Sequence, residues 1–580
     1  MNLKSILSIL LFYVVVAGEA RNESDAILDM SFEKAKVIFP AMLSERASME
    51  ADGTPTYDFC EVNEDGIMLF YNYVEQYYCE LVAGPDKYTG IVRVPSYVGE
   101  EHLPVVGVGV YAFSQCSGLT EVYLPNTMLY LEAVSFYSSQ DLQKVNVGNH
   151  LMAIGGNAFE GCKELSSINI PQSLEYVGYE AFMHCDKIAS PLYNEKYFFY
   201  YPMDGSEGQS YSIPSGIEVI GEGAFIFTDL KEVVIPNTVK TISAFAFDGS
   251  DIEKVNIPNS VETIGYKAFG QTRIKEITVP SSVKNFGKRV FGTAWNLKKV
   301  VLENPLDSIP DATFNNCFDL LEVTYPETVH KIGDRAFTHC ESLTKLPDLS
   351  NIDTLGVEVF AYCYALESIT IPPSITNIPN NAFLYCSGVK NVNLPKGLEN
   401  IGEYAFYHNS KLESITIPST VKSIGNAAFE YCMGLKIINL SNGLVSIGER
   451  AFSQLYELES ITLPESVDYI GSLAFSYGQK LTNVYVYWQI PLQLTMDIFD
   501  SYQYSLGMTL HVPSGTAELY SSSPSWSEFK NIVEDVTSIN CIDNNGKMAH
   551  TPRPTKRLVD GKILIVSESI TTIDGKSFSK

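Results

Sequence analysis

A phenylalanine recurs along most of this chain at a nearly constant interval. From Phe113 onward the spacing is 23 residues for three steps, 43 once, 22 for three steps, 23 for eight and 24 for the last. The set comprises Phe113, Phe136, Phe159, Phe182, Phe225, Phe247, Phe269, Phe291, Phe314, Phe337, Phe360, Phe383, Phe406, Phe429, Phe452, Phe475 and Phe499. A register of this kind is the signature of stacked structural repeats, and each repeat needs its neighbours to bury its apolar side.

The repeat itself is most regular in two copies. Residues 366–386 read LESITIPPSITNIPNNAFLYC, and residues 412–432 read LESITIPSTVKSIGNAAFEYC. Ile369 and Ile371 alternate with polar residues, which predicts a short strand with one buried face. Pro372 then ends the strand because it cannot donate a ladder hydrogen bond. A Gly such as Gly402 often precedes the Phe and predicts a sharp backbone bend.

This repeat sequence resembles the leucine-rich repeat of the BspA-like family of bacterial surface and secreted proteins, and the resemblance covers about residues 57–535. It implies a β-rich repeat solenoid with one short parallel strand per 22–24-residue repeat and a cap at each end. It also implies a protein used for adhesion or binding, and it implies no reaction.

The segments outside the repeats divide the chain further. Residues 1–20 are predicted to be a signal peptide, because Lys4 precedes a short apolar stretch and small residues end it. An uncleaved signal anchor remains the alternative. Residues 21–56 are predicted to be a linker, 57–105 an N-terminal β cap, 106–507 the solenoid and 508–535 a C-terminal cap. Residues 536–580 form a tail with two small strands, interpreted as either an attachment segment or the remnant of a further repeat.

The single 43-residue step predicts an insert at about residues 188–210, folded as a hairpin at the edge of the solenoid. Its aromatic run, Tyr197 to Tyr201, has two interpretations. It either forms a binding patch or packs the hairpin onto the repeats.

Most of the eleven cysteines follow the repeat, three residues after the Phe: Cys162, Cys185, Cys317, Cys340, Cys363, Cys386 and Cys432. This spacing does not match a metal site or a disulfide framework, so buried thiols acting as small apolar fillers are predicted. Cys60 and Cys79 lie outside the repeat, and a disulfide between them and two free thiols both remain open. His184–Cys185 and His339–Cys340 are too far apart in the repeat array to share an ion.

No phosphate-binding loop, zinc-binding motif or nucleophile motif is present, so no catalytic residue, cofactor or metal ligand is predicted. The formal net charge is −28, which argues against nucleic acid and against electrostatic binding to anionic lipid. No insertion into the membrane is expected after signal cleavage.

The candidate binding surface is the polar face of the predicted strands, whose side chains point away from the core. Near the C-terminal end this face becomes aromatic, and aromatic side chains are enriched at interfaces. The candidates are Asn393, Thr416, Asn439, Thr462, Tyr485, Tyr487 and Trp488, with Tyr197 and Tyr200 in the predicted insert.

The predicted function is non-catalytic binding by a secreted or cell-surface protein. The family resemblance favours an adhesin whose partner is a host matrix protein or another cell. One alternative is a glycan-binding or scaffolding component of a surface uptake complex. The other is a secreted hydrolase built on the insert.

Overall fold

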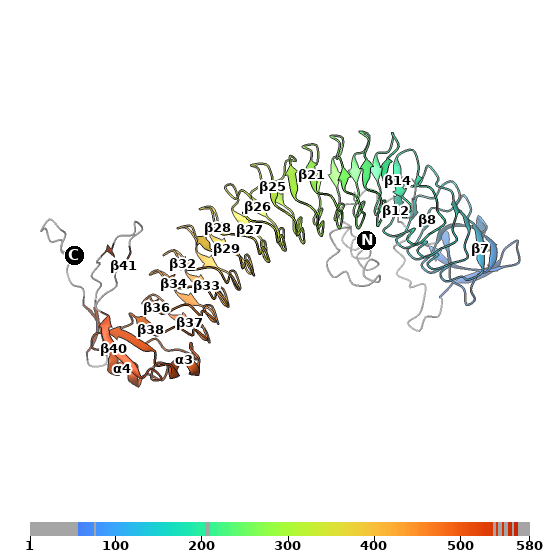
Figure 1. Cartoon of the computed structure of the whole chain (residues 1–580). Helices are drawn as coiled ribbons and strands as arrows, with labels where there is room; N and C mark the ends of the chain where they lie inside the picture. Colours follow the sequence, from blue (N-terminus) through green and yellow to red (C-terminus); the bar gives the residue numbers. More distant parts are fainter. Residues whose placement is uncertain are drawn as a thin grey trace. The chain divides into compact units, whose positions relative to one another are not determined.

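The computed structural model describes residues 56–74, 77–203 and 209–536, with four short strands between 541 and 566. The predicted signal peptide, nearly all of the linker and the predicted tail strand at 570–578 lie outside the described residues. The chain divides into two compact units, Met1–Val329 and His330–Lys580. Each unit is a parallel β-solenoid, in which strands of successive rungs lie side by side (Figure 1).

One rung of the second unit shows how the repeat folds. Strand β28 (Ser368–Thr370) pairs in parallel with β30 (Asn391–Asn393) of the next rung. After the Pro turn a second strand, β29 (Asn377–Ile378), pairs in parallel with β31 (Asn400–Ile401). The predicted strand, here called the front strand, is confirmed. The two-residue return strand was not predicted.

The front strands follow the repeat in both units. In the first unit they are β4 (Gly90–Arg93), β7 (Leu119–Tyr123), β9 (Lys144–Asn146), β11 (Ser167–Ile168), β15 (Ser210–Ser212), β17 (Glu232–Val234), β19 (Lys254–Val255), β21 (Glu276–Val279), β23 (Lys299–Leu302) and β25 (Glu322–Thr324). In the second unit β28 and β30 are followed by β32 (Ser414–Thr416), β34 (Ile437–Asn439), β36 (Ser460–Leu463) and β38 (Asn483–Val486).

The return strands follow the same spacing, and all but β6 and β14 have two residues. In the first unit they are β6 (Leu103–Val108), β8 (Tyr130–Leu131), β10 (Ala153–Ile154), β12 (Tyr176–Val177), β14 (Tyr197–Tyr200), β16 (Val219–Ile220), β18 (Thr241–Ile242), β20 (Thr263–Ile264), β22 (Asn285–Phe286) and β24 (Ser308–Ile309). In the second unit they are β26 (Lys331–Ile332), β27 (Thr354–Leu355), β29, β31, β33 (Ser423–Ile424), β35 (Ser446–Ile447) and β37 (Tyr469–Ile470).

The recurring Phe forms a stack of buried rings in the core of each unit. Phe113 and Phe136 have ring centroids 4.8 Å apart, and Phe383 and Phe406 are 5.4 Å apart. These four side chains have no exposed surface. Stacked pairs add about 0.5–1.5 kcal/mol beyond the area they bury, so the repeated Phe stabilises the contact between neighbouring rungs.

The Gly before the Phe has a different role from the predicted one. Neither Gly402 nor Gly425 has a positive φ. A Cβ on Gly425 would instead lie 2.5 Å from the backbone nitrogen of Glu403 in the preceding rung. Glycine is therefore needed because two rungs approach each other closely. Positive φ values fall on turn residues such as Tyr385 (φ 58°) and Asn381 (φ 58°).

The predicted insert at residues 188–210 is a rung of the solenoid, so that prediction was wrong. Strand β14 pairs in parallel with β16, with Tyr197 opposite Val219 and Phe198 opposite Ile220. This is the same 22-residue step that relates β16 to β18. A short antiparallel contact between β13 (Leu192–Tyr193) and β14 is the only hairpin element in the described part of this rung.

The rung differs from its neighbours in length, which is why the Phe pattern missed it. Phe198 and Ile220 are equivalent strand positions in the two rungs. Tyr201 follows Phe198 by three positions, whereas Phe225 follows Ile220 by five. The Tyr201 amide donates to Ala224 O at 2.7 Å, as the Phe225 amide does to Ala246 O. Tyr201 therefore occupies the place of the Phe, and its ring stacks 5.5 Å from Phe225.

Short segments cover the ends. The N-terminal residues form β1 (Phe59–Val62), β2 (Met68–Val74), β3 (Tyr78–Val82) and β5 (Tyr97–Val98). Residues 501–536 form α3 (Ser501–Ser505), β39 (Thr509–Pro513), α4 (Ala517–Ser522) and β40 (Asn531–Val536). The tail contains β41 (Cys541–Ile542), β42 (Met548–Ala549), β43 (Thr555–Val559) and β44 (Lys562–Val566). Cys60 on β1 and Cys79 on β3 are both free, so they do not form a disulfide.

Candidate functional site

The front strands of the second unit present a regular polar face. Thr370, Asn393, Thr416, Asn439 and Thr462 are all exposed, as the alternation predicts. Parallel pairing in register places equivalent positions side by side, so Thr and Asn alternate along the stack. Asn393 Nδ2 donates to Thr370 Oγ1 at 3.3 Å, and Asn439 Nδ2 donates to Thr416 Oγ1 at 3.1 Å.

This face, here called the neutral face, has no charged side chain at the outward positions of its front strands from β28 to β38. Charged residues directly precede most of these strands, and Lys436 Nζ lies 4.0 Å from Glu413 Oε2. Its outward positions are Ser368, Thr370, Asn391, Asn393, Ser414, Thr416, Ile437, Asn439, Ser460, Thr462, Asn483 and Tyr485. The corresponding face of the first unit is charged, and its rungs are joined by ion pairs. Lys254 Nζ lies 2.6 Å from Glu232 Oε1, and Lys299 Nζ lies 3.4 Å from Glu322 Oε2.

The C-terminal end of the neutral face holds a hydrogen-bonded histidine. The ring of His511, on β39, stacks 4.2 Å from Tyr485. Its Nδ1 lies 2.9 Å from a carboxylate oxygen of Asp535, and its Nε2 lies 3.1 Å from Asn483 Oδ1. These contacts hold the half-buried Tyr485 ring in place. The sequence analysis missed His511 and Asp535, because β39 and β40 lie beyond the last recurring Phe, and it did not single out Asn483 on β38.

Trp488 does not belong to this face, which corrects the prediction. Only 6% of its surface is exposed, and its indole N–H donates to Val467 O at 3.0 Å. Its own carbonyl accepts a hydrogen bond from the Tyr520 hydroxyl at 2.8 Å, and its ring packs against Trp526. The indole is therefore part of the core beneath the C-terminal cap. Tyr487, next to it, is half-buried.

The aromatic run of the shortened rung also faces inward. Phe198, Phe199, Tyr200 and Tyr201 are buried, and Tyr197 is half-buried. Of the two interpretations, packing onto the repeats is therefore confirmed for these four residues. Tyr200 is not available as a surface ligand-binding residue. The hydrolase alternative, which required an insert, loses its structural basis.

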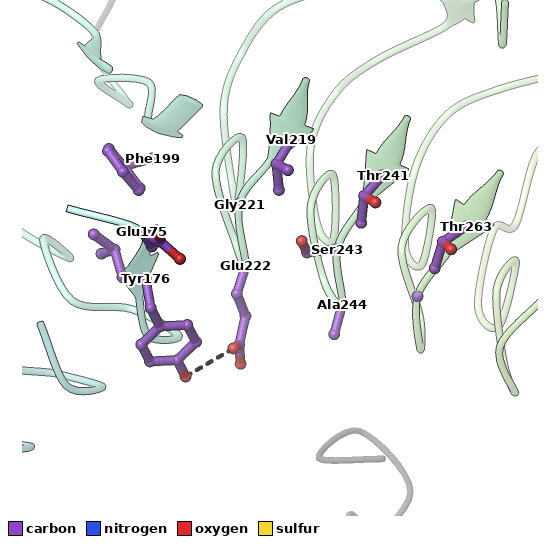
Figure 2. Close-up of a pocket in the computed structure, with 12 residues that line it drawn as sticks. Glu175, Tyr176, Phe199, Val219, Gly221, Glu222, Thr241, Ser243, Ala244 and Thr263 are labelled. Carbon is purple, nitrogen blue, oxygen red and sulfur yellow. Dashed lines mark hydrogen bonds between the residues drawn. The ribbon is translucent and has the colours of Figure 1, made fainter. Parts of the chain in front are cut away.

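A pocket opens beside the shortened rung on the return strands of the first unit (Figure 2). Tyr176, Phe199, Glu222 and Thr241 contribute to its lining. The Tyr176 hydroxyl donates to Glu222 Oε2 at 3.0 Å across the shortened rung. Burial and this carboxylate hold the pKa of Tyr176 well above its ordinary value, so the phenol remains a hydrogen-bond donor.

The repeated cysteines have a hydrogen-bonding role that the sequence analysis missed. Cys162 Sγ lies 3.1 Å from Phe136 O, and Cys386 Sγ lies 3.1 Å from Phe360 O, in each case the Phe of the preceding rung. Asn409 Nδ2 donates to Phe383 O at 2.8 Å from the same repeat position. Ser139 occupies this position in another rung, and its hydroxyl donates to Phe113 O. Ala294 and Leu455 occupy it elsewhere, so the position favours small donors without requiring one. Burial raises the pKa of Cys162 and of Cys386 to about 12.

The described residues hold no group of three or more His, Cys, Asp and Glu side chains able to bind a metal ion. His339 instead stacks 4.2 Å from the ring of Tyr362. Within the same described residues, every helix is too short or too polar to cross a bilayer.

Several solved structures are similar to this chain. A leucine-rich repeat protein from Bacteroides ovatus is 23% identical, with 72% of this chain and all of that chain covered and a TM-score of 0.37. A leucine-rich cell surface protein from Faecalibacterium prausnitzii is 22% identical, with 66% and 95% covered and a TM-score of 0.40. The pneumococcal vaccine antigen PcpA is 16% identical, with 83% and 99% covered and a TM-score of 0.27. No curated protein matches the chain.

The family comparison covers most of the repeats. A family model described as the BspA type leucine-rich repeat region matches residues 103–201, 195–320, 307–436 and 399–496. These matches extend from the first rungs to the last front strands and run through the shortened rung without a gap. They span more than half of the sequence, and the chain therefore belongs to the BspA type leucine-rich repeat family.

Proposed function

We propose that this protein is a non-catalytic binding protein, secreted or held at the cell surface, and that it binds an extracellular protein through the neutral face of the second unit. The observation that carries the proposal is the absence of charge on that face in a chain of net charge −28. A charged side chain must be desolvated or matched when a partner covers it, whereas Ser, Thr and Asn can exchange hydrogen bonds with water for those with a partner.

The geometry of the face supports a partner that lies along the stack. Successive rungs repeat the same pair of outward positions, and solenoids commonly use such extended surfaces for binding. Tyr485 supplies an aromatic anchor at one end, and His511 fixes its orientation. Adhesion to a matrix protein or to another cell is the specific role proposed, and it rests on the family together with the predicted signal peptide.

The experiment is a binding screen of residues 21–580 against immobilised extracellular-matrix proteins, with Thr416→Lys as the test variant. Thr416 is exposed in the middle of the neutral face, so a lysine there adds a charge without filling the core. Thr278→Lys is the matched control, because Thr278 is exposed on β21 of the first unit, at the equivalent position.

Saturable binding that Thr416→Lys weakens by about tenfold, and that Thr278→Lys leaves unchanged, is expected. Equal binding by both variants would rule out the neutral face as the site. No saturable binding to any matrix protein would remove the support for adhesion. Secretion is tested separately by following the full chain and a 21–580 chain in a bacterial export assay.

A further inference from the structure

A column of stacked aromatic side chains runs along the turns of the second unit, away from the neutral face. Its members each lie two residues after a core Phe: His339, Tyr362, Tyr385, His408 and Tyr431. Successive ring centroids are 4.2, 5.2, 4.7 and 5.8 Å apart, and each pair is stacked. We call these five residues the aromatic ladder.

Further rings widen the ladder. Tyr364 lies edge-on to Tyr362, and Tyr407 lies edge-on to both Tyr385 and Tyr431. Tyr404 packs 5.6 Å from Tyr407. Tyr364 is 39% exposed and Tyr404 is 41% exposed, while the inner rings are half-buried. The result is a surface of aromatic carbon and phenol groups that spans five consecutive rungs.

The backbone does not require aromatic residues at this position. Each ladder residue has φ between 58° and 61°, and turn residues of other kinds adopt the same positive-φ conformation in other rungs, such as Gln454 at 63° and Thr293 at 65°. The first unit has Gly161, Gly249 and Thr293 at the equivalent position, and Gln454 follows Tyr431 in the second unit. The solenoid therefore folds without a ring here, and the run of five demands another explanation.

The phenol groups of this surface are available for hydrogen bonding. Burial and the neighbouring Tyr385 raise the pKa of Tyr407 to about 12, so its phenol stays protonated. The carboxylate of Glu341 lies 3.5 Å from His339 Nδ1 at one end of the ladder. Glu430, beside Tyr431, is buried and adds a second carboxyl group near the other end. The Glu341 carboxylate disfavours a polyanion at its end of the ladder.

We propose that the aromatic ladder binds an uncharged polysaccharide. A sugar ring presents apolar C–H groups together with hydroxyls, which fit aromatic carbon edged by phenols and carboxylates. A linear polysaccharide also repeats along its axis, as the ladder does, so neighbouring sugars meet equivalent rungs. A globular protein surface has no such period. This inference concerns a different surface from the neutral face and does not depend on the protein partner proposed above.

The test is native electrophoresis of residues 21–580 through gels that contain hydroxyethylcellulose, galactomannan or soluble starch. Tyr385→Gln is the test variant, because Gln454 shows that the turn accepts glutamine. Tyr477→Gln is the matched control, since Tyr477 occupies the same repeat position two rungs beyond Tyr431 and is 48% exposed. Thermal melting of both variants checks that they remain folded.

Retardation of the parent chain in at least one of the three gels is expected, with affinity about tenfold weaker for Tyr385→Gln and unchanged for Tyr477→Gln. Affinity should also rise with the length of the oligosaccharide. Absence of retardation in every gel, or equal loss in both variants, would overturn the proposal. A ladder variant that loses protein binding, but whose mobility in every gel equals that of the parent chain, would also overturn the proposal. Thr416→Lys should still bind the polysaccharide, which separates this result from failure of the neutral face.

Discussion

Replacing Gly425 by alanine should destabilise the second unit, although the change adds a single methyl group. The new Cβ would lie 2.5 Å from Glu403 N and 2.7 Å from Gly402 C, both backbone atoms of the preceding rung. Ordinary contact begins at 3.4 Å, so the rungs must separate locally by about 0.9 Å. No side chain can rotate to relieve this contact.

The separation acts on hydrogen bonds that hold the two rungs together. The Gly425 amide donates to Ile401 O at 2.8 Å, and the Tyr404 amide donates to Asn426 O at 2.9 Å. Weakening one or two such bonds costs about 0.5–1.5 kcal/mol each, and overpacking of a well-packed site typically costs about 1–3 kcal/mol. The expected loss for Gly425→Ala is therefore about 2 kcal/mol.

Gly397→Ala is the matched control, because the nearest atom to its new Cβ is Pro373 O at 3.8 Å and its φ is not positive. Removing a glycine there restricts the unfolded chain, so the control should be neutral or stabilising by up to about 1 kcal/mol. Urea unfolding followed by circular dichroism measures both variants against the parent. Equal stability of the two variants would refute the argument that close rung approach selects glycine.

Three further outcomes are expected. Among the cysteines whose burial the structure describes, Cys60 is exposed, whereas burial raises the pKa of Cys432 to about 12. A Cys60→Ser variant should therefore lose one equivalent of thiol that reacts fast with Ellman's reagent at pH 8, and an unchanged fast phase would contradict this. Trp488→Ala should lower the free energy of unfolding by about 3–5 kcal/mol, measured by calorimetry, because the indole is buried. A variant that loses binding but keeps its stability would instead support the predicted surface role of Trp488. Burial raises the pKa of Glu80 to about 7, so its folded form holds a proton more tightly than the unfolded chain. The stabilisation by this bound proton is full below about pH 4.5 and is lost as the pH rises to about 7. At pH 8 the parent chain must bury the Glu80 charge and a glutamine avoids it, so Glu80→Gln should raise the melting temperature at pH 8 but not at pH 4.

Local periodicity made the repeat readable from the sequence. The alternation around Ile369 and the Pro that follows it act over a few residues, so they predict the front strand without knowledge of the fold. Stacking of the copies then follows, since a single rung cannot bury its own apolar side. Exposure of Thr416 and Asn439 is a direct consequence of this alternation, whereas burial of Cys386 follows from its fixed place after the core Phe.

The tertiary structure decided the features that depend on contacts between distant rungs. The shortened rung at Tyr201 lacks the Phe that marks every other rung, and only its pairing with the following rung identifies it. Burial of Trp488 depends on Tyr520 and Trp526, which lie in the cap. His511 meets Asn483 across 28 residues, and Tyr362 meets Tyr385 across 23.

What the sequence determined by itself is the rung, its spacing and the side of each strand that faces water, because these follow from local alternation and from the need to bury a repeated apolar layer. What only the tertiary structure decided is which surface residues act together. Side chains one or two rungs apart become neighbours through parallel stacking, and the identity of those neighbours depends on the length of every rung between them. Tyr176 and Glu222, which lie 46 residues apart in the sequence, are joined by a hydrogen bond across the shortened rung.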